Sequence, residues 1–213
     1  MHHQLRQNLP AMPRNMRSLP VDSRGYPVPF FVEWINGVPD FRVASMGAMH
    51  RCVLTKLCWI CGKPLGRLLA FTIGPMCAIN RISSEPPQHP ECAEYAVQAC
   101  PFLSMPKMRR RKDDLPDLAP PPGIMLERNP GVMLVWLTRT FTVLQERHGY
   151  LFEIGAPYKA LWYMEGRKAT RGEVIAAIES GLPFLYEHAK SAEDEKEIDA
   201  LRIIAMRLIP KEN

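Results

Sequence analysis

Four residues in the middle of the chain have the types and spacing of metal ligands. Cys58 and Cys61 are separated by two residues and are followed by Gly62, while His89 and Cys92 are separated by two residues where the segment PECAEYAVQAC begins. Two thiolates at this spacing can chelate one ion where the backbone turns tightly, and the glycine permits that turn. The pattern predicts one structural Zn²⁺ held by Cys58, Cys61, His89 and Cys92, with Cys77 as an alternative fourth ligand.

The remaining cysteines and histidines lack such spacing. We expect Cys52 and Cys100 to be buried thiols, and neither His50 nor His148 lies in a motif that would make it a general base. The competing interpretation is that all six cysteines are small core residues.

The elements that must position the ligands follow from local sequence. Residues 67–82 form two apolar stretches around Gly74-Pro75, which predicts a hairpin, and Pro90 and Glu91 favour a helix that begins beside His89. A knuckle, a hairpin and a helix that carries the second ligand pair resemble a treble-clef zinc finger, over about residues 58–100.

The treble clef is also the scaffold of HNH-type endonucleases, so the resemblance raises an enzymatic alternative. Those enzymes need a general-base histidine in the hairpin, and the stretch LLAFTIGPMCAINR contains none. Four protein ligands also leave no open position on a zinc ion. We therefore expect a non-enzymatic protein and keep a degenerate HNH-like nuclease as the last alternative.

The charge distribution favours a polyanionic partner. Residues 1–112 contain 15 Lys and Arg against 6 Asp and Glu, while residues 113–213 contain 12 against 16. We expect DNA or RNA to be contacted by the basic residues around the zinc module, and Trp59 either to stack on a base or to pack over the knuckle. These basic residues are Lys56, Lys63, Arg67, Arg81, Arg109, Arg110, Arg111 and Lys112.

The alternative partner is another protein. An acidic C-terminal helix, proline clusters and the lack of evident base-reading residues support that view. The segments CWICGKPLG, GPMCAINR, EPPQHPECAEYAVQACPFL and WYMEGRKATRGEVIAAIESGLP are similar to uncharacterised proteins of bacteriophages and prophages, a resemblance that implies an accessory or host-modulating protein without assigning an activity.

The order of predicted elements gives an α+β fold in four parts. Residues 1–24 read as a flexible arm, 25–104 as a hairpin (31–35 and 38–43, turning at Asn36-Gly37) plus the zinc module, and 105–123 as a proline-rich linker. Residues 124–213 read as a small α+β domain with strands at 132–143, 150–154 and 160–164.

Two C-terminal helices are expected to close that domain. The first begins at a capping box of Thr170 and Glu173 and ends at Gly181 and Pro183. The second covers 185–208, with Ile198, Leu201, Ala205 and Leu208 toward the core. No apolar run is long enough to span a bilayer, and clustered cysteines of this kind favour the reducing cytoplasm.

Overall fold

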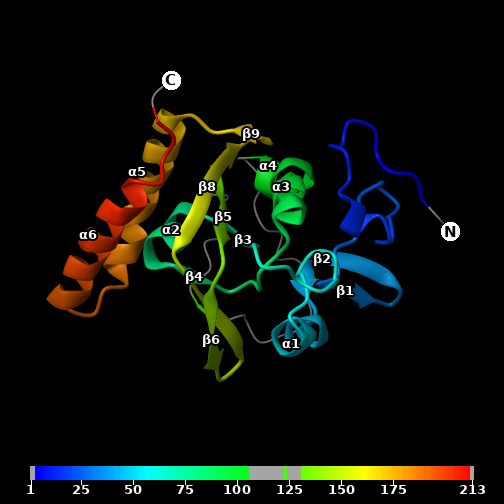
Figure 1. Ribbon diagram of the computed structural model, residues 1–213, viewed down its shortest axis with the longest axis horizontal. Coiled ribbons are helices and arrows are strands. Elements are labelled where there is room, and N and C mark those ends of the chain that lie inside the picture. Colours follow the sequence, from blue (N-terminus) through cyan, green and yellow to red (C-terminus); the bar gives the residue numbers. More distant parts are fainter. Residues whose placement is uncertain (1–2, 106–121, 124–130, 212–213) are drawn as a thin grey trace.

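A computed structural model describes residues 3–105, 122–123 and 131–211 of the chain. At its centre lies a four-stranded antiparallel sheet in the order β3-β5-β8-β9, built from Leu69–Ile73, Met133–Thr138, Pro157–Met164 and Arg167–Lys168. The fold is α+β, with strands near the N-terminus and two helices at the C-terminus, as the sequence predicts (Figure 1).

Side chains of the central strands alternate between two apolar layers, as the two-residue period of a strand requires. On one face Phe71, Trp136 and Trp162 pack with α2 (Pro75–Asn80), α5 (Arg171–Glu187) and α6 (Ala192–Met206). On the other face Val135 and Tyr163 pack with α3 (Pro90–Ala99). The sheet is therefore covered on both sides, and β5 is buried along its whole length.

A second, three-stranded sheet has the order β4-β7-β6, from Ile82–Ser83, Gly149–Ile154 and Phe141–Glu146. The strand expected at 132–143 is in fact two strands, because the chain leaves the central sheet after Thr138. The Thr138 hydroxyl donates to the carbonyls of Thr140 and Ala156, at 3.1 and 2.9 Å, and fixes this corner. The strands expected at 150–154 and 160–164 are confirmed as β7 and β8.

The segment between the metal-ligand pairs differs from the predicted hairpin. Gly74-Pro75 is not a hairpin turn: Pro75 is the first residue of α2, and β3 pairs with β5. Proline fixes the same φ at the first helical position as in a turn, so the local sequence fits both. Between β3 and α3, an isolated bridge from Ala70 to Gln88 brings the chain back beside β3.

Of the predicted boundaries of the two C-terminal helices, the start of α5 is confirmed, whereas the end of α5 and the start of α6 differ. The capping box of Thr170 and Glu173 is present, but the prediction that Gly181 and Pro183 end this helix is wrong, since α5 continues to Glu187. The next helix begins at Ala192 rather than at 185, with the Ser191 hydroxyl accepting from the Asp194 backbone N–H. Its expected core-facing residues do pack on the core: Ile198, Leu201, Ala205 and Leu208.

The N-terminal hairpin is confirmed as β1 (Val32–Ile35) and β2 (Val38–Ala44), and both turn residues have positive φ, 51° at Asn36 and 77° at Gly37. Helix α1 (Met46–Thr55), which the sequence analysis did not predict, follows it. Residues 3–24 are not a separate arm: the 3₁₀ turn η1 (Arg14–Met16) lies against the metal-ligand region with Met16 buried.

The expected division into two domains also differs from the structure. Strand β3 belongs to the predicted zinc module and β5 to the predicted C-terminal domain, yet their residues pair directly from Leu69↔Thr138 to Ile73↔Leu134. A short helix α4 (Pro101–Ser104) follows α3, and the predicted linker lies largely outside the described residues. In the part of the chain that the structure describes, no helix has the length and apolarity needed to cross a membrane.

Candidate metal centre

The first pair of cysteines lies in a tight knuckle, residues 57–64. Its ends are joined by a bridge between Leu57 and Pro64, and the Gly62 N–H donates to the Cys58 carbonyl at 2.8 Å. Gly62 has φ 68°, and a Cβ there would lie 2.7 Å from the Phe30 ring. A glycine is thus required both by the backbone conformation and by the close approach of Phe30.

The second pair comes from the start of α3. His89 is the N-cap residue, Pro90 occupies the first helical position, and Cys92 follows within the first turn. The His89 carbonyl accepts from the Ala93 N–H at 3.0 Å, which continues the helical bonding pattern to the cap. This local geometry turns the imidazole and the Cys92 thiol toward the same point.

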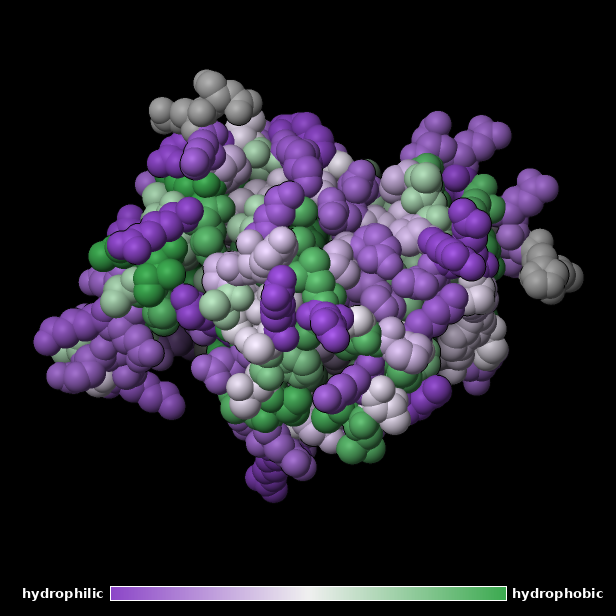
Figure 2. All heavy atoms as spheres, viewed as in Figure 1, coloured by the Kyte–Doolittle hydropathy of each residue, from purple (hydrophilic) through white to green (hydrophobic). Residues whose placement is uncertain are grey.

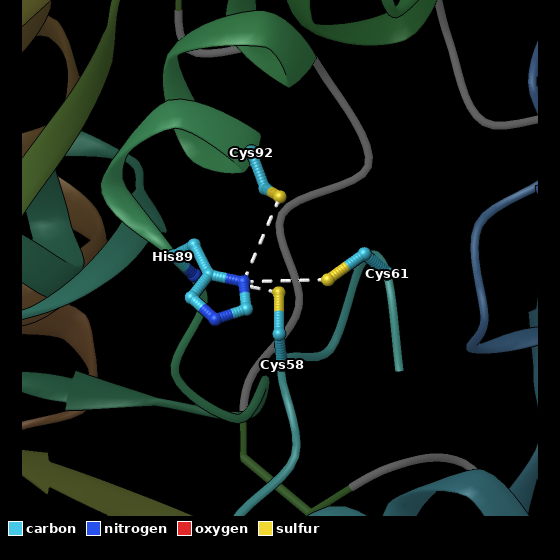
Figure 3. A group of neighbouring side chains, drawn as sticks. All are labelled: Cys58, Cys61, His89 and Cys92. Carbon is cyan, nitrogen blue, oxygen red and sulfur yellow. Dashed lines mark hydrogen bonds between the residues drawn. The ribbon is translucent and has the colours of Figure 1, made fainter. Parts of the chain in front are cut away.

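Knuckle and helix bring the four predicted ligands together (Figure 3). Their ligand atoms all lie within 4.8 Å of one another, and all four residues are buried. His89 Nδ1 lies 3.3 Å from Cys61 Sγ and 3.8 Å from Cys92 Sγ, while the His89 backbone N–H donates to Cys58 Sγ at 3.3 Å. The arrangement could hold a metal ion.

The other imidazole nitrogen is already engaged. His89 Nε2 lies 2.9 Å from the carbonyl oxygen of Pro64, so it carries the proton and donates it to the knuckle. In the neutral ring that bond leaves the Nδ1 lone pair facing the sulfur atoms, which is the tautomer a metal-ligating histidine needs once a cation displaces the Nδ1 proton.

The electrostatics of the cluster favour a cation. Hydrogen bonds from the thiols of Cys61 and Cys92 hold the pKa of Cys58 far below its usual 9.0, whereas the Cys58 and Cys61 sulfurs raise the pKa of Cys92. The same two sulfurs raise the pKa of His89 to about 11. Without a bound cation, these directions describe one negative charge shared among the sulfurs and a proton on His89 Nδ1. A divalent cation stabilises several thiolates at once and displaces their protons.

Residues near the N-terminus cover this site. Met16 is 1% exposed and packs in one cluster with Cys58, Cys61 and Cys92. The Asn15 side-chain amide donates to Glu91 Oε1 at 2.9 Å and so ties the same segment to the first turn of α3. The ligands are therefore shielded by a segment that the sequence analysis took for a flexible arm.

The remaining cysteines lie elsewhere. Cys77 is in α2, packs on the main core, and is outside the ligand cluster, so it does not take the place of His89. Burial raises the pKa of Cys52 to about 12 and that of Cys77 to about 11, and it raises the pKa of Cys100 as well. A raised pKa disfavours the reactive thiolate in all three. Cys52 is buried, as expected, whereas Cys100 is half-buried.

Comparisons with protein-family models, with curated proteins and with solved structures find no match to this chain.

The predicted nucleic-acid contacts are only partly brought together. Lys56 and Arg67 line an open groove of about 720 Å³. Lys63 is half-buried on the knuckle, and Arg81 lies apart from the groove with its guanidinium 6.0 Å from the Trp136 ring. Arg109, Arg110, Arg111 and Lys112 lie outside the described residues.

Two residues that sequence reasoning missed complete the groove, Arg139 and Tyr158. Arg139 directly follows β5 and Tyr158 is the second residue of β8, so the sequence analysis, which expected one strand over 132–143, could not place Arg139 at a corner. Trp59, by contrast, is buried and stacks on Phe31 with ring centroids 4.9 Å apart. It is a packing residue and is not available to a base.

Proposed function

We propose that the chain is a non-enzymatic protein, stabilised by one zinc ion, that binds nucleic acid. The observation that carries the proposal is the buried cluster of three cysteines and one histidine, whose knuckle is flanked on both sides by residues that line a cation-rich groove. The ion fixes the segment, and the groove supplies the binding surface.

The donor set supports zinc as the metal. Thiolates and a neutral imidazole are the ligands of structural Zn²⁺. Bond lengths of about 2.3 Å to sulfur and 2.0 Å to nitrogen place tetrahedral ligand atoms about 3.5–3.8 Å apart, close to the 3.3 and 3.8 Å between His89 Nδ1 and two of the sulfurs. Reduced thiols of this kind are retained in the cytoplasm.

A structural role follows from ligand count and burial. Four protein ligands fill a tetrahedral ion, so no position is left for a water nucleophile or a substrate oxygen. The knuckle and the ligand-bearing helix start support a treble-clef-type module, although the intervening hairpin of that fold is replaced by β3, α2 and β4. The absence of a histidine from LLAFTIGPMCAINR weighs against nuclease chemistry.

Native mass spectrometry of protein purified without chelator tests the metal, with one zinc per chain expected. Fluorescence anisotropy with labelled DNA and RNA at several salt concentrations tests the partner. Phosphate contacts release counterions, so binding should weaken steeply with salt. Zinc-free folded protein would refute the first part, and the absence of any nucleic-acid binding would refute the second.

A protein partner is the second candidate, favoured by apolar side chains on the C-terminal helices. Phe184, Ile203 and Ile204 are exposed at 39, 60 and 38%, and hydrophobic surface is visible over α5 and α6 in Figure 2. An accessory protein of the phage type could dock through this face. Replacing Ile203 with Asp would then abolish capture of that partner and leave nucleic-acid affinity unchanged.

A further inference from the structure

The groove has two walls that come from distant parts of the chain. One wall is formed by Lys56, just before the knuckle, and residues 65–69, just after it. The other wall is the corner between β5 and β6 together with the start of β8. The pairing of Leu69 with Thr138 sets the two walls side by side. The groove therefore forms only in the tertiary fold and cannot be recognised from a local sequence motif.

Its polar character is cationic. Lys56, Arg67 and Arg139 are exposed and line the groove, and none of the lining residues is acidic. Within the described part of the chain, no carboxylate lies within ion-pair distance of these three cations. Three cations in one concave surface raise the local concentration of a polyanion.

Tyr158 gives the groove an aromatic surface. It is 61% exposed, and the guanidinium of Arg139 lies 5.2 Å from its ring centroid. A large aromatic side chain left this open is able to stack on another flat ring. Bases of a duplex already stack on their neighbours, whereas bases of a single strand are free to stack on protein.

The metal site holds one wall in place. His89 Nε2 donates to the Pro64 carbonyl at 2.9 Å, and the Leu65 N–H donates to the Lys56 carbonyl at 2.9 Å. Lys56 itself has φ 52°, a left-handed conformation that the folded knuckle must maintain. Loss of the ion would release the residues that carry Lys56 and Arg67.

The geometry points to this groove as a binding site for single-stranded nucleic acid, in which Lys56, Arg67 and Arg139 contact successive phosphates and Tyr158 stacks on a base. The inference rests on the proposed function and specifies its site. DNA and RNA strands share the chemistry that is recognised here, namely phosphates joined to unstacked bases.

The test is anisotropy with the full-length zinc-loaded protein and fluorescein-labelled oligothymidine of about 16 nucleotides, enough for one site. Tyr158→Ala should weaken binding about 5- to 150-fold with little change in salt dependence. Tyr158→Phe should retain the affinity because it keeps the ring. Arg67→Ala and Arg139→Ala should each make the negative slope of log K (the association constant) against log salt concentration shallower by about 0.7.

Matched controls lie outside the groove. Trp34→Ala removes another exposed aromatic residue, at 46% exposure, and Lys196→Ala removes another exposed cation, on α6. Neither should change the affinity. Because the groove residues to be replaced are exposed, their variants should keep the circular dichroism spectrum and zinc content of the parent.

Other probes separate the alternatives. An oligouridine of equal length should bind if the site accepts both sugars, and preference for one strand type identifies the natural ligand. Equal or tighter binding of a duplex or of polyglutamate, unaffected by Tyr158→Ala, would overturn the single-strand assignment. Oligonucleotide binding that all groove variants retain would refute the groove and leave the proposed function standing, whereas failure of every nucleic acid to bind would refute both.

Discussion

Replacing one metal ligand should unfold more than the metal site. Cys92 is fully buried in the first turn of α3, and its substitution by Ser removes a thiolate while leaving the other ligands in place. Structural zinc contributes about 10–16 kcal/mol of apparent binding free energy in small zinc modules. Whole domains have about 5–15 kcal/mol of unfolding free energy, so a zinc ion bound at this site would contribute most of the stability.

Unfolding caused by Cys92→Ser should extend from the metal site into the central sheet. Strand β3 follows the knuckle and pairs with β5 over its whole length, so the knuckle cannot separate without disturbing the sheet. A loss of only about 5 kcal/mol would lower the Tm by about 10–20 °C in a protein of this size. We expect one cooperative transition, at a much lower temperature, rather than a folded remnant from 124–213.

The assay is thermal unfolding followed by circular dichroism, with zinc content measured by mass spectrometry on the same samples. Cys100→Ser is the matched control, since this half-buried thiol lies outside the ligand cluster. It should retain one zinc and shift the Tm by a few degrees at most. A folded Cys92→Ser protein with an unchanged Tm would refute the assignment of a structural ion.

Three further substitutions probe other parts of the chain. Met16→Ala should cost about 2–5 kcal/mol and speed zinc transfer to a chelator; an unchanged transfer rate would show that this residue does not shield the site. Gly62→Ala should lower stability by at least about 1 kcal/mol because of its positive φ, whereas Gly172→Ala, with open space around its Cβ, should be neutral or stabilising in the same melt. The hydrogen bond from Arg167 lowers the pKa of Glu173 from 4.5 to about 2, so the carboxylate stabilises the fold above pH 4.5 and loses that effect as the pH falls toward 2. Denaturant titrations should therefore show a stability advantage over Glu173→Gln above pH 4.5 that vanishes toward pH 2; a difference independent of pH would contradict this.

Structural features that depend on residues a few positions apart were predicted correctly. Asn36-Gly37 forms its turn because both residues tolerate positive φ, and Thr170 with Glu173 forms its box because the partners are three residues apart. The grouping of the four metal ligands also followed from spacing, since each half-site is local and few other donors were available.

Features decided by distant contacts could not be predicted in this way. Pro75 suits a turn or a helix start, and it starts α2 because β3 pairs with β5 instead of with a following hairpin strand. Pro183 is accommodated inside α5 because the neighbouring Gly181 and Leu182 are buried in the core, and their packing stabilises the helix beyond the proline. Met16 shares its cluster with Leu9, Met12 and Leu19, but Pro10 and Pro13 between them oppose a continuous helix, so their spacing did not predict burial against the knuckle.

The pairing of Leu69 with Thr138 has a consequence for synthesis on the ribosome. The knuckle and α3 leave the exit tunnel first and would be able to capture an ion, but β3 has only its bridge to Gln88 and no partner strand until β5 emerges. At about 5–20 residues per second this wait lasts several seconds, during which the apolar edge formed by residues 69–73 is exposed. Early metal capture would limit that hazard by anchoring both ends of the waiting segment, so zinc supply during translation should govern how much nascent chain avoids aggregation.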